Sequence, residues 1–286
     1  MGIDTTELVL PTFFVIGASK SGTTSLHIYL NAHPEIEMTA DMEPHFMIGP
    51  GLQGRLSAYA DQFPGETKIR GDSSPGYAVY PRNPEAASNI AANVPEARFV
   101  YVVRDPVERC LAQYAQHVMT GQEDKRIERA IRPDDPACEY VNASRYATNL
   151  EAYLKHFKRK RILIVDQTEL RRERLKTLAQ IFAHVGASPG FRDDSFAVEH
   201  NVRGADNVQL PALFRGLKGG RLVGLSRRVL PARARSWAIE NLRRVAGRDI
   251  RPEPSQELRM RLEIVLGEET MRFRELAARD FEHWCV

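Results

Sequence analysis

The chain has 286 residues, of which 43% are hydrophobic and 27% charged, with a net charge of +3. This size fits one large α/β unit, so we expect a single domain over residues 1–286. No stretch is apolar and long enough for a membrane span, and the mild positive charge does not predict a nucleic-acid-binding protein.

The first residues indicate where the protein is located in the cell, and the spacing of the cysteines indicates whether they bind a metal. The first residues lack a basic stretch followed by an apolar core and a cleavage site, so we expect a cytoplasmic protein. Cys110, Cys138 and Cys285 are widely spaced, without the spacing of metal ligands. We therefore expect buried or incidental thiols and no metal site.

Strand and helix patterns alternate over the first two thirds of the chain, beginning with a buried strand at 12–17 and a helix at 23–32. The later elements are a short strand ending at Asp72, a helix at 84–93, a strand in "ARFVYVVRDP", a helix at 106–117, a helix in "SRYATNLEAYLKHF", a strand in "RILIVDQTEL" and a helix from Thr168. This alternation predicts a three-layer α/β/α fold with a central parallel sheet.

Apolar spacing predicts two amphipathic helices in the second half of the chain. The helix from Thr168 should bury one face, and Ser255 should cap a long final helix. The residues expected to face inward are Leu175, Leu178, Ile181, Phe182 and Val185 in the first helix and Leu258, Leu262, Leu266, Phe273 and Leu276 in the second.

The segment at about 205–250 is rich in arginine and is predicted to be a helical lid or insertion. Its arginines are consistent with a solvated helix face, a surface for an acidic substrate, or a peripheral contact with an anionic membrane. Its apolar residues suit an amphiphilic acceptor or a dimer interface. The sequence does not separate these alternatives, and it leaves the oligomeric state open.

The stretch "FFVIGASKSGTTSLHIYL" at 13–30 predicts a strand, a turn and a helix. Such a turn presents backbone N–H groups and the positive end of a helix dipole to one point, which binds phosphate-like anions. Lys20 adds a positive charge, but it precedes Gly22, whereas the nucleotide-triphosphate motif has lysine directly after the second glycine. The turn is therefore P-loop-like without matching that motif.

The spacing Gly-x-x-Lys-x-Gly-Thr-Thr-Ser resembles the 5′-phosphosulfate loop of sulfotransferases that use 3′-phosphoadenosine 5′-phosphosulfate (PAPS), most closely the heparan-sulfate type and its bacterial relatives. The resemblance covers most of residues 12–204, and the ending "LAARDFEHW" is similar to that of bacterial members. It implies PAPS binding without a metal. The turn residues implied in this binding are Ser19, Lys20, Ser21, Gly22, Thr23, Thr24 and Ser25.

The segment "DMEPHFM" at 41–47 resembles the family loop that carries the general base. Glu43 aligns with the family glutamate that removes a proton from the acceptor hydroxyl, and His45 is the rival base. Lys20 is implied to stabilise the leaving phosphosulfate oxygen. The cysteine pairs of the Golgi relatives are absent, which agrees with a cytosolic, bacterial-type enzyme.

The segment "RFVYVVRDPVERCLAQYAQH" resembles the family's 3′-phosphate site. Arg104 occupies the position of the phosphate-binding arginine. Eight residues later the family has a serine where this chain has Ala112, which removes one hydroxyl donor. Gln113 and Arg109 are candidate substitutes, although an arginine at position 109 is more typical of a surface ion pair.

Three later segments also resemble family elements. In "GDSSPGY", Asp72, Ser74 and Tyr77 are predicted to line the acceptor side, with an ordinary Ser-Pro turn as the alternative. Tyr146 is either an aromatic near the nucleotide or part of a helix core. The segment "EHNVRG" places Arg203 and Gly204 over the 3′-phosphate.

The sequence thus predicts transfer of a sulfuryl group from PAPS to a hydroxyl of a carbohydrate, glycolipid or natural-product acceptor. One alternative is a magnesium-dependent nucleotide kinase or related phosphotransferase, with Asp166 as the nearest candidate for a magnesium ligand. A second alternative is a non-catalytic protein that binds anions or membranes through the arginine-rich segment.

Overall fold

The computed structural model describes residues 8–198 and 253–286, and these contain a central sheet of five parallel strands. The strand order is β2-β3-β1-β4-β5, so β1 lies in the middle, between β3 and β4. The strands are β1 (Phe13–Gly17), β2 (Ile36–Met38), β3 (Ile69–Ser73), β4 (Arg98–Val103) and β5 (Ile162–Asp166). The prediction of a parallel α/β sheet is confirmed.

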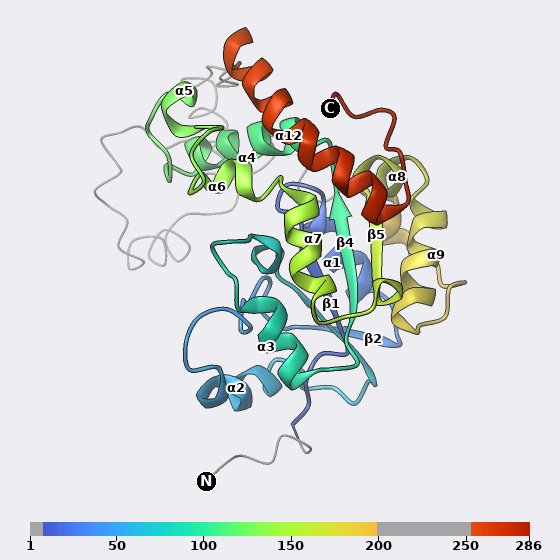
Figure 1. Ribbon diagram of the computed structural model, residues 1–286. Helices are drawn as coiled ribbons and strands as arrows, with labels where there is room; N and C mark the ends of the chain where they lie inside the picture. Colours follow the sequence, from blue (N-terminus) through green and yellow to red (C-terminus); the bar gives the residue numbers. More distant parts are fainter. Residues whose placement is uncertain (1–7, 199–252) are drawn as a thin grey trace, which may run out of the picture.

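Helices cover both faces of the sheet and give three layers (Figure 1). Phe13 and Val15 of β1 point to one face, whereas Phe14 and Ile16 point to the other. The first face packs against α1 (Thr23–Asn31), α8 (Gln167–Arg172) and α9 (Arg174–Val185), and the second against α3 (Ala86–Asn93), α7 (Tyr146–Leu154) and the second half of α12 (Gln256–Ala277).

The remaining helical segments surround this sandwich. They are α2 (Leu56–Ala60), α4 (Pro106–Met119), α5 (Ile127–Ala130), α6 (Glu139–Asn142) and 3-10 turns at Leu52–Arg55, Pro75–Ala78, Arg159–Arg161 and Asp194–Ala197. A separate apolar cluster joins α4 to the first half of α12 through Val107 and Cys110 on one side and Leu258 and Leu262 on the other. Figure 1 shows α12 running from α4 past α7 towards α8.

The cap of α12 agrees with its sequence prediction. Ser255 Oγ accepts a hydrogen bond of 3.2 Å from the N–H of Leu258, which satisfies one of the donors left open at a helix start. Leu258, Leu262, Leu266 and Phe273 are buried, and Leu276 is partly buried.

Two sequence predictions about the fold need correction. The single helix expected from Thr168 is divided into α8 and α9 at Glu173, and Leu175 in the predicted apolar face is 49% exposed. Leu175 is the second residue of α9, and the buried residues of this helix begin at Thr177. Strand β2 was not predicted, because three residues are too few to show a period. The arginine-rich segment at 205–250 lies outside the described residues.

Among the residues that the structure describes, no helix has the length and apolar character that a membrane span requires.

Candidate active site

The residues singled out in the sequence converge at the carboxyl edge of the sheet. Parallel strands all end at the same edge, and ligands of open α/β sheets bind there, where the direction of strand addition reverses. Here that reversal occurs beside β1, between β3 and β4. Lys20 follows β1, Glu43 follows β2, Ser74 follows β3 and Arg104 follows β4.

The turn after β1 has the features of an anion-binding site. Lys20 and Gly22 have φ angles of 69° and 94°, in the left-handed region. Helix α1 begins at Thr23 with no side-chain cap on its first N–H groups, so the positive end of its dipole faces the turn. The hydroxyl of Ser21 is fully buried and has no hydrogen-bond partner among the described residues. These groups fit a phosphate or sulfate group.

The loop of Glu43 and His45 adopts a strained backbone. Both residues have left-handed φ angles, 59° and 55° respectively, and such angles cluster at functional sites. The His45 backbone N–H donates to Ser74 Oγ at 3.1 Å, and Nδ1 of its ring lies 2.5 Å from the Glu43 carbonyl oxygen. The ring also packs so close to Gly76 that a Cβ there would lie 2.7 Å from Nε2. His45 therefore fixes the loop.

Glu43 lies at the surface, yet its carboxyl group is perturbed. Partial desolvation by the surrounding protein raises the pKa of Glu43 above that of an ordinary glutamate. The charges of His45 and Lys20 oppose this rise, and the negative charge of Asp72 adds to it. Lys20 is thus close enough to Glu43 to act on its titration, although 23 positions separate them in the sequence.

Asp72 lies behind this loop as the centre of a hydrogen-bond network. Its carboxylate is fully buried and accepts bonds from Ser74 Oγ at 2.6 Å, Tyr59 OH at 2.6 Å and Tyr77 OH at 2.7 Å. Burial raises the pKa of Asp72, and the three hydroxyl donors oppose the rise. Tyr77 OH also accepts a bond of 3.2 Å from the N–H of Met47.

Ser74 and Tyr77 therefore link the loop that carries Glu43 to the buried Asp72. The sequence placed Asp72, Ser74 and Tyr77 against an acceptor, but the structure buries all three side chains and commits their polar atoms to this network. Contact with an acceptor would require these bonds to be exchanged. Tyr59, the third donor, comes from α2 and had no motif to indicate it.

Arg104 follows β4 with its side chain 19% exposed, and Nη2 lies 3.7 Å from Glu108 Oε2. Tyr146 OH donates to the Arg104 carbonyl oxygen at 2.8 Å. Because Tyr146 is 1% exposed and packs on Phe273, it belongs to the helix core, which decides between the two alternatives left open by the sequence.

Ala112 is buried in α4, and its two candidate substitutes have other partners. Arg109 is fully buried, which corrects the expectation of a surface ion pair. It donates to Ser144 Oγ, Gln113 Oε1 and the Tyr140 carbonyl. The amide of Gln113 also contacts Glu139 at 3.4 Å. Both side chains join α4 to the α6 region.

The other predicted site residues are distributed as follows. Ser19, Thr24 and Ser25 are half-buried in or beside the turn, and Thr23 is buried. Arg203 and Gly204 lie outside the described residues. Within the described ranges, no group of three or more His, Cys, Asp and Glu side chains has the arrangement of a metal site.

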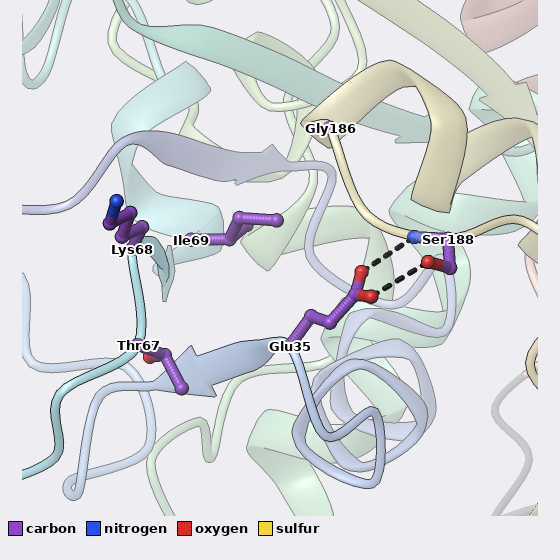
Figure 2. A pocket seen from close by; sticks show the side chains of 6 residues that line it. All are labelled: Glu35, Thr67, Lys68, Ile69, Gly186 and Ser188. Carbon is purple, nitrogen blue, oxygen red and sulfur yellow. Dashed lines mark hydrogen bonds between the residues drawn. The ribbon is translucent and has the colours of Figure 1, made fainter.

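The opposite, amino-terminal edge of the sheet has an open depression of about 470 Å³. It is lined by a residue before β2, by residues just before and at the start of β3, and by residues that follow α9. Figure 2 shows Glu35 there, pointing at Ser188. Its two oxygens accept bonds of 2.7 Å from the Ser188 hydroxyl and N–H. These bonds lower the pKa of Glu35. This depression lies away from the converging loops.

Comparisons with known proteins show which proteins this chain is similar to. Residues 54–191 match the family model described as the sulfotransferase family. This match spans just under half of the chain, and it supports a sulfotransferase family. Mouse heparan sulfate glucosamine 3-O-sulfotransferase 3A1 is 30% identical over 169 residues, which cover 56% of this chain and 42% of the mouse protein.

Two further relatives extend the comparison. The bifunctional heparan sulfate N-deacetylase/N-sulfotransferase 1 of Caenorhabditis briggsae is 27% identical over 194 residues, covering 60% of this chain and 22% of that protein. The chain thus spans less than half the length of these curated relatives. The crystal structure of a sulfotransferase from Alicyclobacillus acidocaldarius has the same fold, with a TM-score of 0.68, 21% identity and coverage of 97% of this chain and 99% of that one.

Proposed function

We propose that the protein transfers a sulfuryl group from PAPS to a hydroxyl group of an acceptor. The observation that carries this proposal is the meeting of an anion-binding turn with a perturbed carboxylate. Lys20 and the buried Ser21 hydroxyl lie in the turn, and Glu43, whose pKa responds to Lys20, lies in the neighbouring loop. Sulfuryl transfer needs both an anion cradle and a base.

Each group has a role in the proposed reaction. The turn residues and the uncapped N–H groups of α1 hold the phosphosulfate, and Lys20 offsets the charge that develops on the bridging oxygen. Glu43 accepts the proton of the acceptor hydroxyl while its oxygen forms a bond to sulfur. The bond between sulfur and the bridging oxygen breaks, and 3′-phosphoadenosine 5′-phosphate (PAP) leaves with that oxygen. Arg104 binds the 3′-phosphate.

The pKa of Glu43 suits this role. A base with a raised pKa binds the proton of the hydroxyl more strongly. The Asp72 network is proposed to position this base. It fixes the loop through Ser74 and Tyr77, so the left-handed backbone of Glu43 and His45 is held by a buried anchor.

The kinase alternative relied on Asp166 as a magnesium ligand. Asp166 is fully buried, and its carboxylate accepts bonds of 2.6 Å from the N–H of Thr168 and 3.0 Å from Trp284 Nε1. His283 Nε2 lies 3.1 Å from the same carboxylate. Asp166 therefore caps α8 and anchors the carboxyl-terminal segment, and this role disfavours the kinase alternative.

The acceptor that we propose is a glucosamine-containing glycan. Curated relatives are named for sulfation of heparan sulfate, one of them at glucosamine. A glycolipid or a glycosylated natural product would present the same kind of hydroxyl. Glycan acceptors of this class are therefore the first to test.

Calorimetric titration with PAP in the absence of metal, compared with magnesium-ATP, tests the proposed donor. We expect the wild-type protein to prefer PAP and the Arg104→Ala variant to lose most of that affinity, because a guanidinium fork binds phosphate through two parallel bonds. Preference for magnesium-ATP would contradict the proposal and favour the kinase alternative.

A further inference from the structure

Glu108 joins two arginines that come from distant parts of the chain. Its Oε1 accepts a hydrogen bond of 2.7 Å from Arg259 Nη2 in α12, and its Oε2 lies 3.7 Å from Arg104 Nη2. The two guanidinium groups therefore approach different oxygens of a single carboxylate. A carboxylate and a phosphate bind guanidinium groups through the same paired-oxygen geometry.

The cluster of Arg104, Glu108 and Arg259 lies near Ala112, where the proposed 3′-phosphate site lacks a hydroxyl donor. Arg104, Glu108 and Ala112 follow one another at four-residue spacing, and the last two lie one turn apart on the same side of α4. The methyl group of Ala112 donates no hydrogen bond, and Arg109 and Gln113 have other partners. Arg259 approaches this side of α4 from another helix.

We propose that Arg259 supplies the donor that Ala112 lacks and binds the 3′-phosphate together with Arg104. This inference rests on the proposed function, because it requires a PAPS site. A guanidinium group has five N–H donors in a planar fork. Among the described residues, one of these N–H donors is used in the hydrogen bond to Glu108. Arg259 can therefore keep this bond while its other N–H groups donate to a phosphate.

Packing fixes the backbone of Arg259, whereas its side chain is partly exposed. The neighbouring Leu258 is buried against the cluster that includes Val107 of α4, so α12 is held against α4. The Arg259 side chain is 39% exposed, compared with 19% for Arg104. A side chain on a rigid helix, aimed by Glu108, loses little freedom when it binds a ligand.

The charges around Arg259 limit how it acts. Glu108 and Glu263, the latter 3.6 Å from Nη1, already face its guanidinium group. These two negative charges offset the positive charge of Arg259, so its electrostatic attraction for a distant anion is weak. Arg259 acts as a directed hydrogen-bond donor at short range, so its removal affects ligands that carry a 3′-phosphate and spares those that do not.

The test compares PAP with adenosine 5′-monophosphate, which lacks the 3′-phosphate, by calorimetry on the full chain. In Arg259→Ala we expect PAP to bind roughly ten- to hundredfold more weakly, with the monophosphate unchanged. Arg261→Ala is the matched control, because Arg261 is two positions further along α12 and pairs with Asp134 at the surface. It should bind both ligands like the wild type.

The outcomes separate this inference from the proposed function. If Arg259→Ala keeps the wild-type preference for PAP, or weakens both ligands equally, the inference is wrong while the proposed function stands. If the wild type itself does not prefer PAP, there is no 3′-phosphate site, and both are wrong. Thermal unfolding of the two variants serves as the check that α12 remains in place.

Discussion

The two edges of the sheet carry similar side chains, but the pKa values of their glutamates are shifted in opposite directions. Each edge has a glutamate and a lysine: Glu43 and Lys20 at the carboxyl edge, Glu35 and Lys68 at the amino edge. The pKa of Glu43 is raised by desolvation, whereas that of Glu35 is lowered by two hydrogen bonds from Ser188. An open depression of about 470 Å³ lies at the amino edge (Figure 2).

The two edges also differ in backbone strain and in hydrogen-bond satisfaction. The carboxyl edge holds a buried hydroxyl without a partner and left-handed φ angles at Lys20, Glu43 and His45. Such features cost free energy, and a fold retains them where they serve a ligand or a reaction. At the amino edge, the hydrogen bonds of Glu35 are satisfied. We therefore place the proposed site by the left-handed φ angles and the unpartnered hydroxyl, and not by the depression.

The largest expected difference in rate is between two variants, each of which replaces the lysine at one edge by alanine. Lys20→Ala should lower kcat for sulfate transfer from PAPS to a glucosamine-containing glycan by about 100- to 1000-fold, by analogy with the loss of a group that stabilises developing charge. Lys68→Ala should leave the rate unchanged, because Lys68 is exposed at the amino edge. Initial rates with radiolabelled PAPS measure both. A Lys20→Ala variant with the wild-type rate would contradict the proposal that the reaction takes place at the carboxyl edge.

Asp72→Asn should lower kcat by about tenfold or more, with little change in PAP affinity, because the base is less well positioned while the turn is intact. The sign of the pH effect follows from charge. Glu43 must be ionised to act, and Asp72 raises its pKa, so the rate of the variant should begin to fall at a lower pH than that of the wild type.

The matched control for Asp72 is Glu269→Gln. Glu269 is also a buried carboxylate, but it accepts bonds from Thr148 between α7 and α12, far from the loop in sequence. The Glu269→Gln variant should have a lower melting temperature, and the acid limb of its pH–rate profile should not move. If both variants shift the profile alike, the proposed positioning role of Asp72 is wrong.

A smaller effect is expected from restoring a hydroxyl at position 112. If Arg259 replaces the missing serine, Ala112→Ser should strengthen PAP binding more in the Arg259→Ala background than in the wild type, by a few-fold. Calorimetric titration of the four proteins of this double-mutant cycle measures the coupling. Equal gains in the two backgrounds would show that the two donors act independently.

Much of the fold could be predicted because the informative segments are long or strongly patterned. Strands β1, β4 and β5 are buried on both faces and appear as apolar runs, and Ser255 marks the start of α12. Strand β2 has three residues, and its pairing with β3 depends on tertiary contacts. The interruption between α8 and α9 likewise left no strong signal in the sequence.

The candidate site was only partly predictable, for a physical reason. Lys20 and Glu43 lie in local motifs whose spacing carries chemistry. Tyr59 reaches Asp72 from a separate helix, and Arg259 reaches Glu108 across 151 positions of sequence. The burial of Arg109 depends on partners in the α6 region, which its own helix pattern does not reveal.

The smallest effect is expected at the amino edge. Glu35→Gln should leave sulfate transfer unchanged and lower the melting temperature slightly at neutral pH. The lowered pKa of Glu35 means that its ionised form stabilises the fold above the ordinary glutamate pKa and that this contribution is lost as the pH falls through the lowered value. The difference from the wild type should therefore disappear in acid. A loss of transfer would place function at this edge.

The most direct test of the central claim is sulfate transfer by Glu43→Gln, measured together with PAP binding. The two protein forms are compared with radiolabelled PAPS and a glucosamine-containing glycan. We predict that the wild type labels the glycan and that the variant binds PAP with wild-type affinity but transfers at least 100-fold more slowly, at roughly the scale of a lost general base. Transfer by the variant at the wild-type rate would contradict it.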